Sequence, residues 1–211
     1  MIEVKNKSVI IFGTGPSLAD YDSSLNEGKI LIGSNEIIFY KTIMDYYFIG
    51  DGGDNDRGYY SDPESYHRYQ AKINKFIRLP SNKNKSPSYR TMPKNLEGFK
   101  YYSVDNETLY NNFPFEKNKV NDAGSISFDI FQWCLLNEVK EIFLIGHDCC
   151  YNQGSFFSSN IKTGIKNHSK IILNNWSKLE NFVNLNYRNT KVINVNPKKM
   201  KCFASSTKIH Q

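Results

Sequence analysis

The chain has 211 residues, of which 39% are hydrophobic, and it includes 14 Tyr and 14 Phe. This length and composition indicate one globular domain with a sizeable core and exclude a disordered chain. The formal net charge of +6 favours anionic partners such as nucleotides, acidic glycans or an anionic membrane face. The basic residues are scattered along the chain, so nucleic-acid binding is not expected.

Neither the N-terminal segment Met1–Lys5 nor any later apolar run has the features of a signal peptide or a membrane span. We therefore expect a cytoplasmic protein. Lys198, Lys199 and Lys201 would allow peripheral contact with lipid headgroups at the inner face of the membrane, or they form a solvated end. The four cysteines are Cys134, Cys149, Cys150 and Cys202, and they form no C-x-x-C pair. Reduced thiols are therefore expected, and a zinc site is not.

The first predicted strand, Ser8–Gly13, runs into the turn Gly13-Thr14-Gly15-Pro16-Ser17-Leu18. Glycines allow a tight turn and close approach of a phosphate to backbone N–H groups. Pro16 suits the first position of a following helix, whose N-terminus favours anions. The pattern therefore predicts a nucleotide-binding turn, and the alternative is a structural turn without a ligand.

The second predicted strand, Lys29–Gly33, is followed by Asn35, at the place where dinucleotide enzymes have an acidic residue. Asn35 offers a donor and an acceptor for a base edge or a sugar hydroxyl, or it is a turn residue or helix cap. Leu18 replaces the third glycine of the dinucleotide motif, which disfavours an NAD enzyme. No G-K-S/T follows the glycines, which excludes a phosphate-loop NTPase.

Further strands are predicted at Asp45–Gly50, Asn74–Leu79, Glu141–Gly146 and Lys191–Val195, and most are apolar runs without alternation, as expected for strands covered on both faces. An additional strand is predicted at Lys100–Val104. Two helices are predicted from apolar stripes at helical spacing. One follows the turn Asn121–Ser125, and the other spans about Lys170–Tyr187 with Trp176 in its core face. The segment 50–119 is rich in Tyr, Asn and Pro and predicts an irregular lid.

Together these elements predict a single Rossmann-like α/β domain over residues 1–211, with a mostly parallel sheet and helices on both faces. In such a sheet ligands lie outside the carboxyl ends of the strands. Those ends carry mostly polar or glycine residues: Gly13–Ser17, Asn35, Asp51 and Gly146-His147-Asp148. A helix begins near Gly124 and Ser125. Asp148 is also a plausible helix cap or loop anchor, and His147 is expected to be buried.

The chain resembles the small bacterial sialyltransferases that use CMP-sialic acid, and equally the related domain named after archaeal 6-hydroxymethylpterin diphosphokinase. The resemblance covers the first fifty residues and 121–203. It is carried by these segments: Gly13–Leu18, Ser34-Asn35, Ala123-Gly124-Ser125, Lys140–Asp148, Tyr151–Gly154 and Asn194–Pro197.

This resemblance implies that Thr14, Gly15 and Asn35 hold a nucleotide, and that Gly124 and Ser125 bind its cytidine side. Asp51 falls where the sialyltransferases have an Asn at the end of the third strand. Of the two tyrosines that assist the departing phosphate, Tyr151 matches the first, whereas Phe157 replaces the second. His168, in Asn167-His168-Ser169, resembles the catalytic base, and the alternative is a surface histidine before a helix.

The implied reaction is metal-independent transfer from a nucleotide-sugar donor to a glycan or glycolipid acceptor in bacterial surface-glycan synthesis. A base takes the proton of the acceptor hydroxyl while the nucleotide leaves. Two alternatives stay open. In a pterin-diphosphokinase-like enzyme, Asp51 and Asp148 would hold Mg²⁺ against a triphosphate. The chain would otherwise be a non-catalytic nucleotide-binding module. The residues leave the oligomeric state open.

Overall fold

A computed structural model describes residues 4–35, 37, 42–50, 71–78, 98–104, 115–149, 166–195, 200, 202–203 and 205–206. The strands are β1 (Ser8–Phe12), β2 (Ile30–Ser34), β3 (Met44–Ile49), β4 (Ala71–Arg78), β5 (Phe99–Tyr102), β6 (Glu141–Ile145), β7 (Lys191–Val195) and β8 (Ser205–Ser206). The helices are the 3₁₀ segments η1 (Pro16–Asp20) and η2 (Ser23–Asn26), and the α-helices α2 (Ile126–Leu136) and α3 (Lys166–Asn186).

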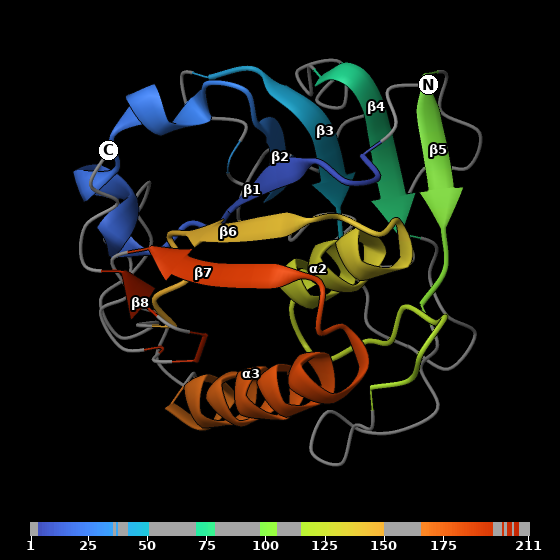
Figure 1. The fold of residues 1–211 in the computed structure, drawn as a ribbon, viewed down its shortest axis with the longest axis vertical. Helices are drawn as coiled ribbons and strands as arrows, with labels where there is room; N and C mark the ends of the chain where they lie inside the picture. The colour runs from blue at the N-terminus through green and yellow to red at the C-terminus, as the bar shows by residue number, and fades with distance from the viewer. Residues whose placement is uncertain are drawn as a thin grey trace.

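The eight described strands form one parallel sheet in the order β5-β4-β3-β2-β1-β6-β7-β8 (Figure 1). The central strand β1 pairs with β2 on one side, where Val9 lies opposite Ile30, and with β6 on the other, where Ile10 lies opposite Phe143. The strand order therefore reverses direction between β1 and β6. In open parallel sheets, ligand crevices lie at the carboxyl ends of strands beside such a point.

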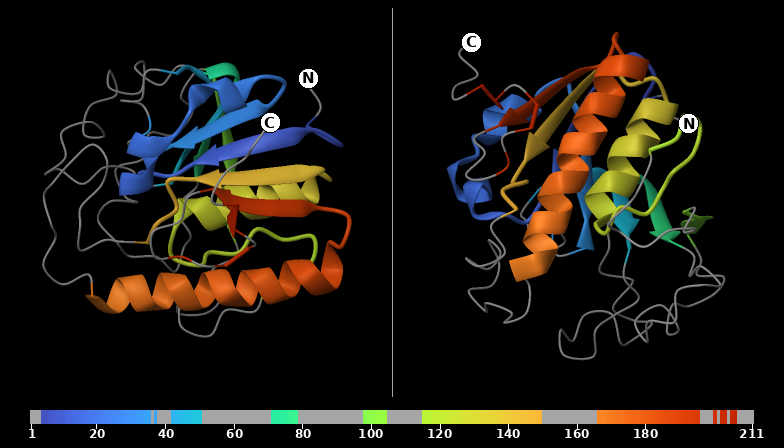
Figure 2. Two further views of the ribbon diagram at one scale, coloured as in Figure 1. Left: turned by 60° about the vertical axis from the view of Figure 1, so that its left-hand side comes forward. Right: turned by 90° about the horizontal axis from the view of Figure 1, so that it is seen from below.

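Alternate residues of the strands face two separate apolar cores, because successive side chains of a strand point to opposite faces. Val9 and Ile11 of β1 face the larger core, whereas Ile10 and Phe12 face the other. Both α2 and α3 cover the larger core and lie side by side (Figure 2). The α/β class with a parallel sheet, predicted from the apolar runs, is confirmed.

The other face of the sheet is covered in part by the 3₁₀ segments. Leu18 of η1 is buried in the smaller core, and Tyr21 packs edge-on against Phe12 with 5.5 Å between ring centroids. Pro16 begins η1, as its fixed backbone favours, but the segment has only five residues. Asp22 is the N-cap of η2, and its side chain accepts a hydrogen bond from Ser24 N. The first glycine turn is thus followed by a short 3₁₀ helix, and a long helix dipole is missing there.

Trp176 anchors α3 on the larger core. Its ring lies 4.5 Å from that of Phe128 and 5.8 Å from that of Phe131, both in α2. Ile172, Leu179 and Val183 follow the same buried stripe, so the predicted core face is confirmed. The helix begins at Lys166, earlier than expected, which places His168 inside its first turn and not before it. No helix in the described part of the chain is both long and apolar enough to cross a bilayer.

The segment 50–119 contains β4 and β5, which extend the sheet beyond β3. The sequence predicts a strand at both places, and β4 begins three residues before its predicted start at Asn74. The remainder of the expected lid lies largely outside the described residues.

Candidate functional site

Four polar or glycine-rich segments lie at one edge of the sheet, because all strands are parallel and their carboxyl ends lie together. They are the residues that follow β1, β2, β3 and β6: Gly13–Ser17, Asn35, Gly50 and Gly146–Asp148. Strands β3, β2, β1 and β6 are consecutive in the sheet. This edge is the candidate functional site.

The glycine turn after β1 packs directly against the turn after β6. Gly13 N donates to Ile145 O and Gly15 N donates to Gly146 O, both at 2.7 Å. A Cβ on Gly15 would lie 2.5 Å from Gly146 O and closer still to Asp148 Oδ2, and a Cβ on Gly13 would lie 2.6 Å from Gly146 O. Neither residue is among those with positive φ. Both positions therefore require glycine for close contact between two protein turns.

Asp148 places a carboxylate at the start of η1. Its Oδ2 accepts a hydrogen bond from Ser17 N at 2.6 Å, and the residue is fully buried. This contact agrees with the predicted role of Asp148 as a loop anchor. Ser17 is also buried, and its Oγ has no hydrogen-bond partner among the described residues.

Most backbone N–H groups of the glycine turn already have acceptors within the protein. Gly13, Gly15 and Leu18 donate to carbonyl oxygens, Ser17 donates to Asp148, and Pro16 has no N–H. In the described part of the chain, Thr14 N is the one remaining donor of this turn without a protein acceptor. Thr14 is partly exposed. A phosphate at this turn would therefore meet Thr14, and not a cradle of several amides.

Asn35 adopts the left-handed conformation, with φ of 44°, directly after β2. Its Oδ1 accepts from Gly50 N at 3.2 Å, and its backbone O accepts from the Tyr47 hydroxyl. These contacts give Asn35 the turn role considered above. Its side-chain NH₂ group is the part that would be available to a ligand.

The start of α2 approaches the same edge of the sheet. A Cβ on Gly50 would lie 2.9 Å from Ile126 Cδ1, so the end of β3 is in close contact with the first residue of α2. Ser125 is the N-cap, and its side chain accepts from Ser127 N at 3.4 Å. Gly124 has φ of +90°, and its N–H donates to Asp122 Oδ1 at 2.9 Å. Contacts through Gly50 thus connect the Gly124–Ser125 turn with Asn35.

A buried ion pair that the sequence did not suggest as part of the site lies behind this turn. Arg78, at the end of β4, contacts Asp122 through Nη2, and both side chains are buried. An arginine inside a predicted buried strand was the available signal, because a buried guanidinium requires a partner.

Three predicted residues cannot be placed by their side chains. Asp51 and Tyr151 lie outside the described residues, as does the side chain of His168. Phe157, which replaces the second tyrosine, also lies outside them.

His147 is buried against Trp176, with 5.7 Å between ring centroids, and its Nε2 lies 3.1 Å from Ile11 O. Burial lowers the pKa of His147 from its ordinary 6.5 to about 4, although the bond to Ile11 O and the Asp148 carboxylate both raise it. The ring is therefore neutral near pH 7 and donates from Nε2 to Ile11 O. It links β6 to β1 and the predicted burial of His147 is confirmed.

Two of the described thiols, those of Cys134 and Cys202, are poor nucleophiles. Burial raises the pKa of the Cys134 thiol well above its ordinary range. Burial is also the main cause of the raised pKa of Cys202, whose Sγ lies 3.4 Å from Ser177 Oγ. Within the described ranges, no group of three or more His, Cys, Asp or Glu side chains could hold a metal ion.

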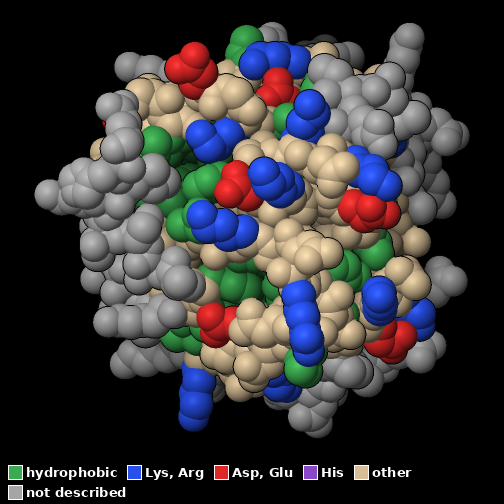
Figure 3. Space-filling model, in the orientation of Figure 1, with side chains coloured by type: hydrophobic (Ala, Val, Ile, Leu, Met, Phe, Trp, Pro, Cys, Tyr) green, Lys and Arg blue, Asp and Glu red, His purple; other side chains and the backbone are tan. Residues whose placement is uncertain are grey.

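The surface agrees with the scattered basic residues of the sequence. On the face in Figure 3, Lys and Arg side chains are spread among acidic and polar ones and do not form one continuous patch.

Comparison with solved structures shows that the chain has a sialyltransferase-like fold. It is similar to the sialyltransferase CstII from Campylobacter jejuni in complex with a substrate analogue, cytidine-5'-monophosphate. The two are 18% identical, with a TM-score of 0.50 over 90% of this chain and 80% of that chain. The sialyltransferase CST-II in complex with a trisaccharide acceptor and CMP is 17% identical, with a TM-score of 0.49 over 89% and 80%. No family model and no curated protein matches the chain.

Proposed function

We propose that the chain is a glycosyltransferase that uses a nucleotide-activated sugar, with CMP-sialic acid or a similar compound as donor. A glycan or glycolipid of the bacterial surface would be the acceptor. The observation that supports this most is a sialyltransferase-like fold in which the turns at Thr14, Asn35 and Ser125 lie at the carboxyl ends of neighbouring parallel strands or in contact with them. The similar structure holds cytidine-5'-monophosphate, which is the nucleotide part of such a donor.

In this proposal the nucleotide lies across the ends of β1 and β2 and the start of α2. Thr14 N and Oγ1 donate to the phosphate, and the NH₂ group of Asn35 binds the sugar or base. Gly124 and Ser125 contact the nucleoside side, and Asp51, which follows β3, belongs to the same pocket. Asp148 acts indirectly, because its carboxylate holds Ser17 N and so fixes the turn that presents Thr14.

The reaction is direct displacement at the anomeric carbon. The acceptor hydroxyl oxygen forms a bond to that carbon while the bond from the carbon to the nucleotide phosphate breaks. His168 takes the hydroxyl proton, and Tyr151 donates a hydrogen bond to the departing phosphate. Transfer then needs no metal ion.

Thermal shift with CMP, UDP, GDP and ATP tests nucleotide binding, with and without EDTA. We expect CMP to raise the melting temperature most, and EDTA to have no effect on it.

Transfer is then measured with CMP-sialic acid and a panel of glycan acceptors. We expect His168→Ala to lower kcat by about 10²–10⁴-fold, while CMP affinity is retained. The rate of the wild type should rise with pH, because a general base must be deprotonated to take the hydroxyl proton.

His210→Ala is the matched control, because it removes a histidine to which no role is assigned. Equal activity of the His168→Ala variant and this control would exclude His168 as the base. Stabilisation by CMP without turnover of any nucleotide sugar or of ATP would favour a non-catalytic binding module.

The pyrophosphate-transferring alternative needs Mg²⁺ on Asp51 and Asp148. One observation weighs against it: Asp148 is fully buried and its Oδ2 is already within 2.6 Å of Ser17 N. If ATP with Mg²⁺ gives the largest thermal stabilisation and EDTA abolishes activity, this alternative replaces the glycosyltransferase.

A further inference from the structure

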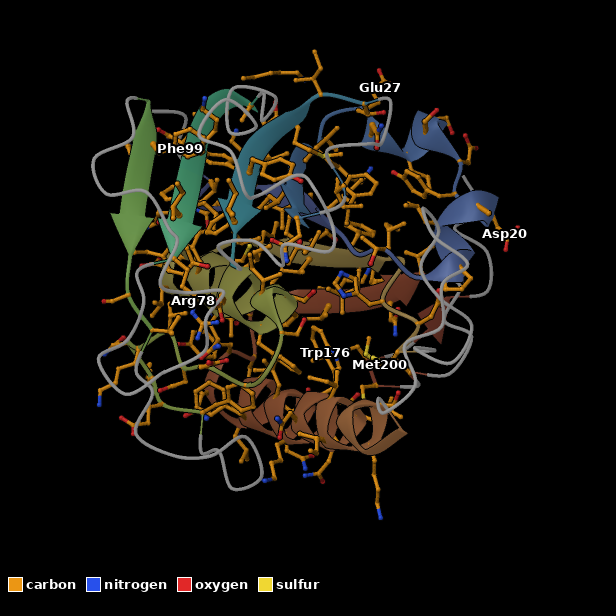
Figure 4. All side chains as sticks on the ribbon, turned by 180° about the vertical axis from the view of Figure 1, so that it is seen from behind. Asp20, Glu27, Arg78, Phe99, Trp176 and Met200 are labelled. Carbon is orange, nitrogen blue, oxygen red and sulfur yellow. The ribbon has the colours of Figure 1, made fainter. Side chains whose placement is uncertain are left out.

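Arg78 is buried at the carboxyl end of β4, beside α2 (Figure 4). Its side chain is 4% exposed, and it contacts two acids that stand on either side of the first residues of α2. Asp122 comes before the helix, and Asp129 lies in its first turn. A single guanidinium therefore joins the edge region of the sheet to the beginning of α2.

Asp122 uses both carboxylate oxygens for different partners. Oδ2 contacts Arg78 Nη2, whereas Oδ1 accepts from Gly124 N at 2.9 Å. Gly124 has φ of +90°, and because a glycine adopts many backbone conformations, the bond from its N–H to Asp122 is what selects this one. The carboxylate thus transmits the position of Arg78 to the backbone of the turn.

The surroundings of this bridge fix it further. Arg78 Nη1 lies 3.6 Å from Asp129 Oδ2, which also accepts from the Tyr102 hydroxyl at 3.0 Å. On the other side of the turn, Asn175 of α3 donates from Nδ2 to Ala123 O at 2.9 Å. Arg78 of β4 and Asn175 of α3 therefore both hold the segment that leads into Ser125, whereas Tyr102 of β5 holds Asp129, the second acid beside Arg78.

We propose that Arg78 is a positioning residue that acts through Asp122 to hold the Gly124–Ser125 turn in the conformation that binds nucleotide. This inference rests on the proposed function. A buried ion pair usually contributes little net stability compared with apolar side chains of similar size, because both charges lose their hydration. Its contribution here is geometric: Arg78 is not among the residues assigned to the nucleotide, and through Asp122 it sets the position of Gly124, which is.

Two isosteric variants separate this role from general support of the fold. Asp122→Asn replaces one of the two carboxylate oxygens with an NH₂ group. This group is a donor, so either Gly124 N or Arg78 then faces a donor and loses its acceptor. Asp129→Asn is the matched control, since it also removes a buried acid beside Arg78, and the Oδ2 of this acid faces Arg78 and the Tyr102 hydroxyl instead of Gly124 N. Both variants should lower the melting temperature.

CMP affinity and amide exchange should distinguish the two. We expect Asp122→Asn to raise the Kd for CMP about tenfold, and Asp129→Asn to change it by less than about threefold. Hydrogen exchange of the amides of residues 124–127 in the free protein should become faster in Asp122→Asn and stay unchanged in Asp129→Asn. Arg78→Lys keeps a charge but loses the two-nitrogen fork, and it should behave as Asp122→Asn does.

The outcomes also separate this inference from the proposed function. If the wild type binds CMP and all three variants have the same Kd and the same exchange at 124–127, Arg78 does not position the turn. If Asp129→Asn loses affinity as much as Asp122→Asn does, the cluster supports the fold only, and the inference fails. If the wild type binds none of CMP, UDP, GDP and ATP, the proposed function fails and the inference fails with it.

Discussion

At the scale of single residues, Gly13 and Gly15 lie where two turns from distant parts of the sequence meet. The residues that would collide with a side chain on Gly15 are Gly146 and Asp148. The place of the glycines at the end of the first strand was correctly predicted from the sequence. Glycine is required at these positions because the two turns pack closely together. This could not be predicted from the sequence, because the local pattern does not say which turn lies opposite. A variant of Gly15 therefore reports on the fold before it reports on a ligand.

We expect Gly15→Ala to lower the free energy of unfolding by about 1–3 kcal/mol, because the new Cβ would force apart two packed turns. Urea unfolding followed by circular dichroism measures this. Gly28→Ala is the control: its Cβ would meet nothing within 4 Å, although φ of +69° makes it strained by about 1–2 kcal/mol. An unfolding free energy of Gly15→Ala equal to that of the wild type would contradict the packing role. Nucleotide binding at this turn is better tested with Thr14→Ala.

At the scale of elements, the strands agree with the sequence prediction to within a few residues, because continuous apolar runs between polar turns have few other solutions in an α/β protein. The exceptions have physical reasons. β8 is two serines with no apolar pattern. The helix after the first turn is a 3₁₀ segment that ends at Asp20, because Asp20, Asp22 and Ser23, which favour turns, follow within a few residues. The link between Arg78 and Asp122 joins elements 44 residues apart, which no local pattern contains.

Asn35 connects the ends of β2 and β3, and its two side-chain groups are separable by mutation. Asn35→Asp keeps an acceptor for Gly50 N and tolerates the left-handed backbone, but it replaces the NH₂ group with an oxygen. We expect this variant to unfold at nearly the wild-type temperature while its CMP affinity, measured by calorimetry, decreases by roughly 5–100-fold. Asn35→Ala should lower both the unfolding temperature and the CMP affinity. Wild-type CMP affinity in Asn35→Asp would restrict Asn35 to its structural contact.

At the scale of the whole molecule, one buried histidine makes global stability depend on pH. His147 has a pKa of about 4 in the folded protein, below its ordinary 6.5, because it is buried. The unfolded chain therefore binds a proton more readily. Its contribution to stability is complete above pH 6.5 and is lost as the pH falls towards 4, by about 3 kcal/mol in total.

Urea unfolding at pH 7 and pH 4.5 measures this loss. His147→Gln keeps a donor for Ile11 O but cannot titrate, so its unfolding free energy should fall less than that of the wild type between the two pH values. Using the difference between the two proteins cancels the titration of the carboxylates they share. Parallel pH profiles would show that His147 is not the group responsible.

The position of β1 between β2 and β6 has a consequence for how the chain folds during synthesis. Five strands, β1 to β5, come from residues 8–102, yet the partner of β1 on its other side begins only at Glu141. Until β6 leaves the ribosome, Val9–Phe12 form an open sheet edge that is apolar on both faces. Long-range parallel pairing of this kind is slow, so the unfinished chain exposes the unpaired apolar edge of β1 for most of its synthesis. The contacts between the turns at Gly15 and Asp148 complete this pairing, and we expect the nascent chain to be prone to aggregation until they form.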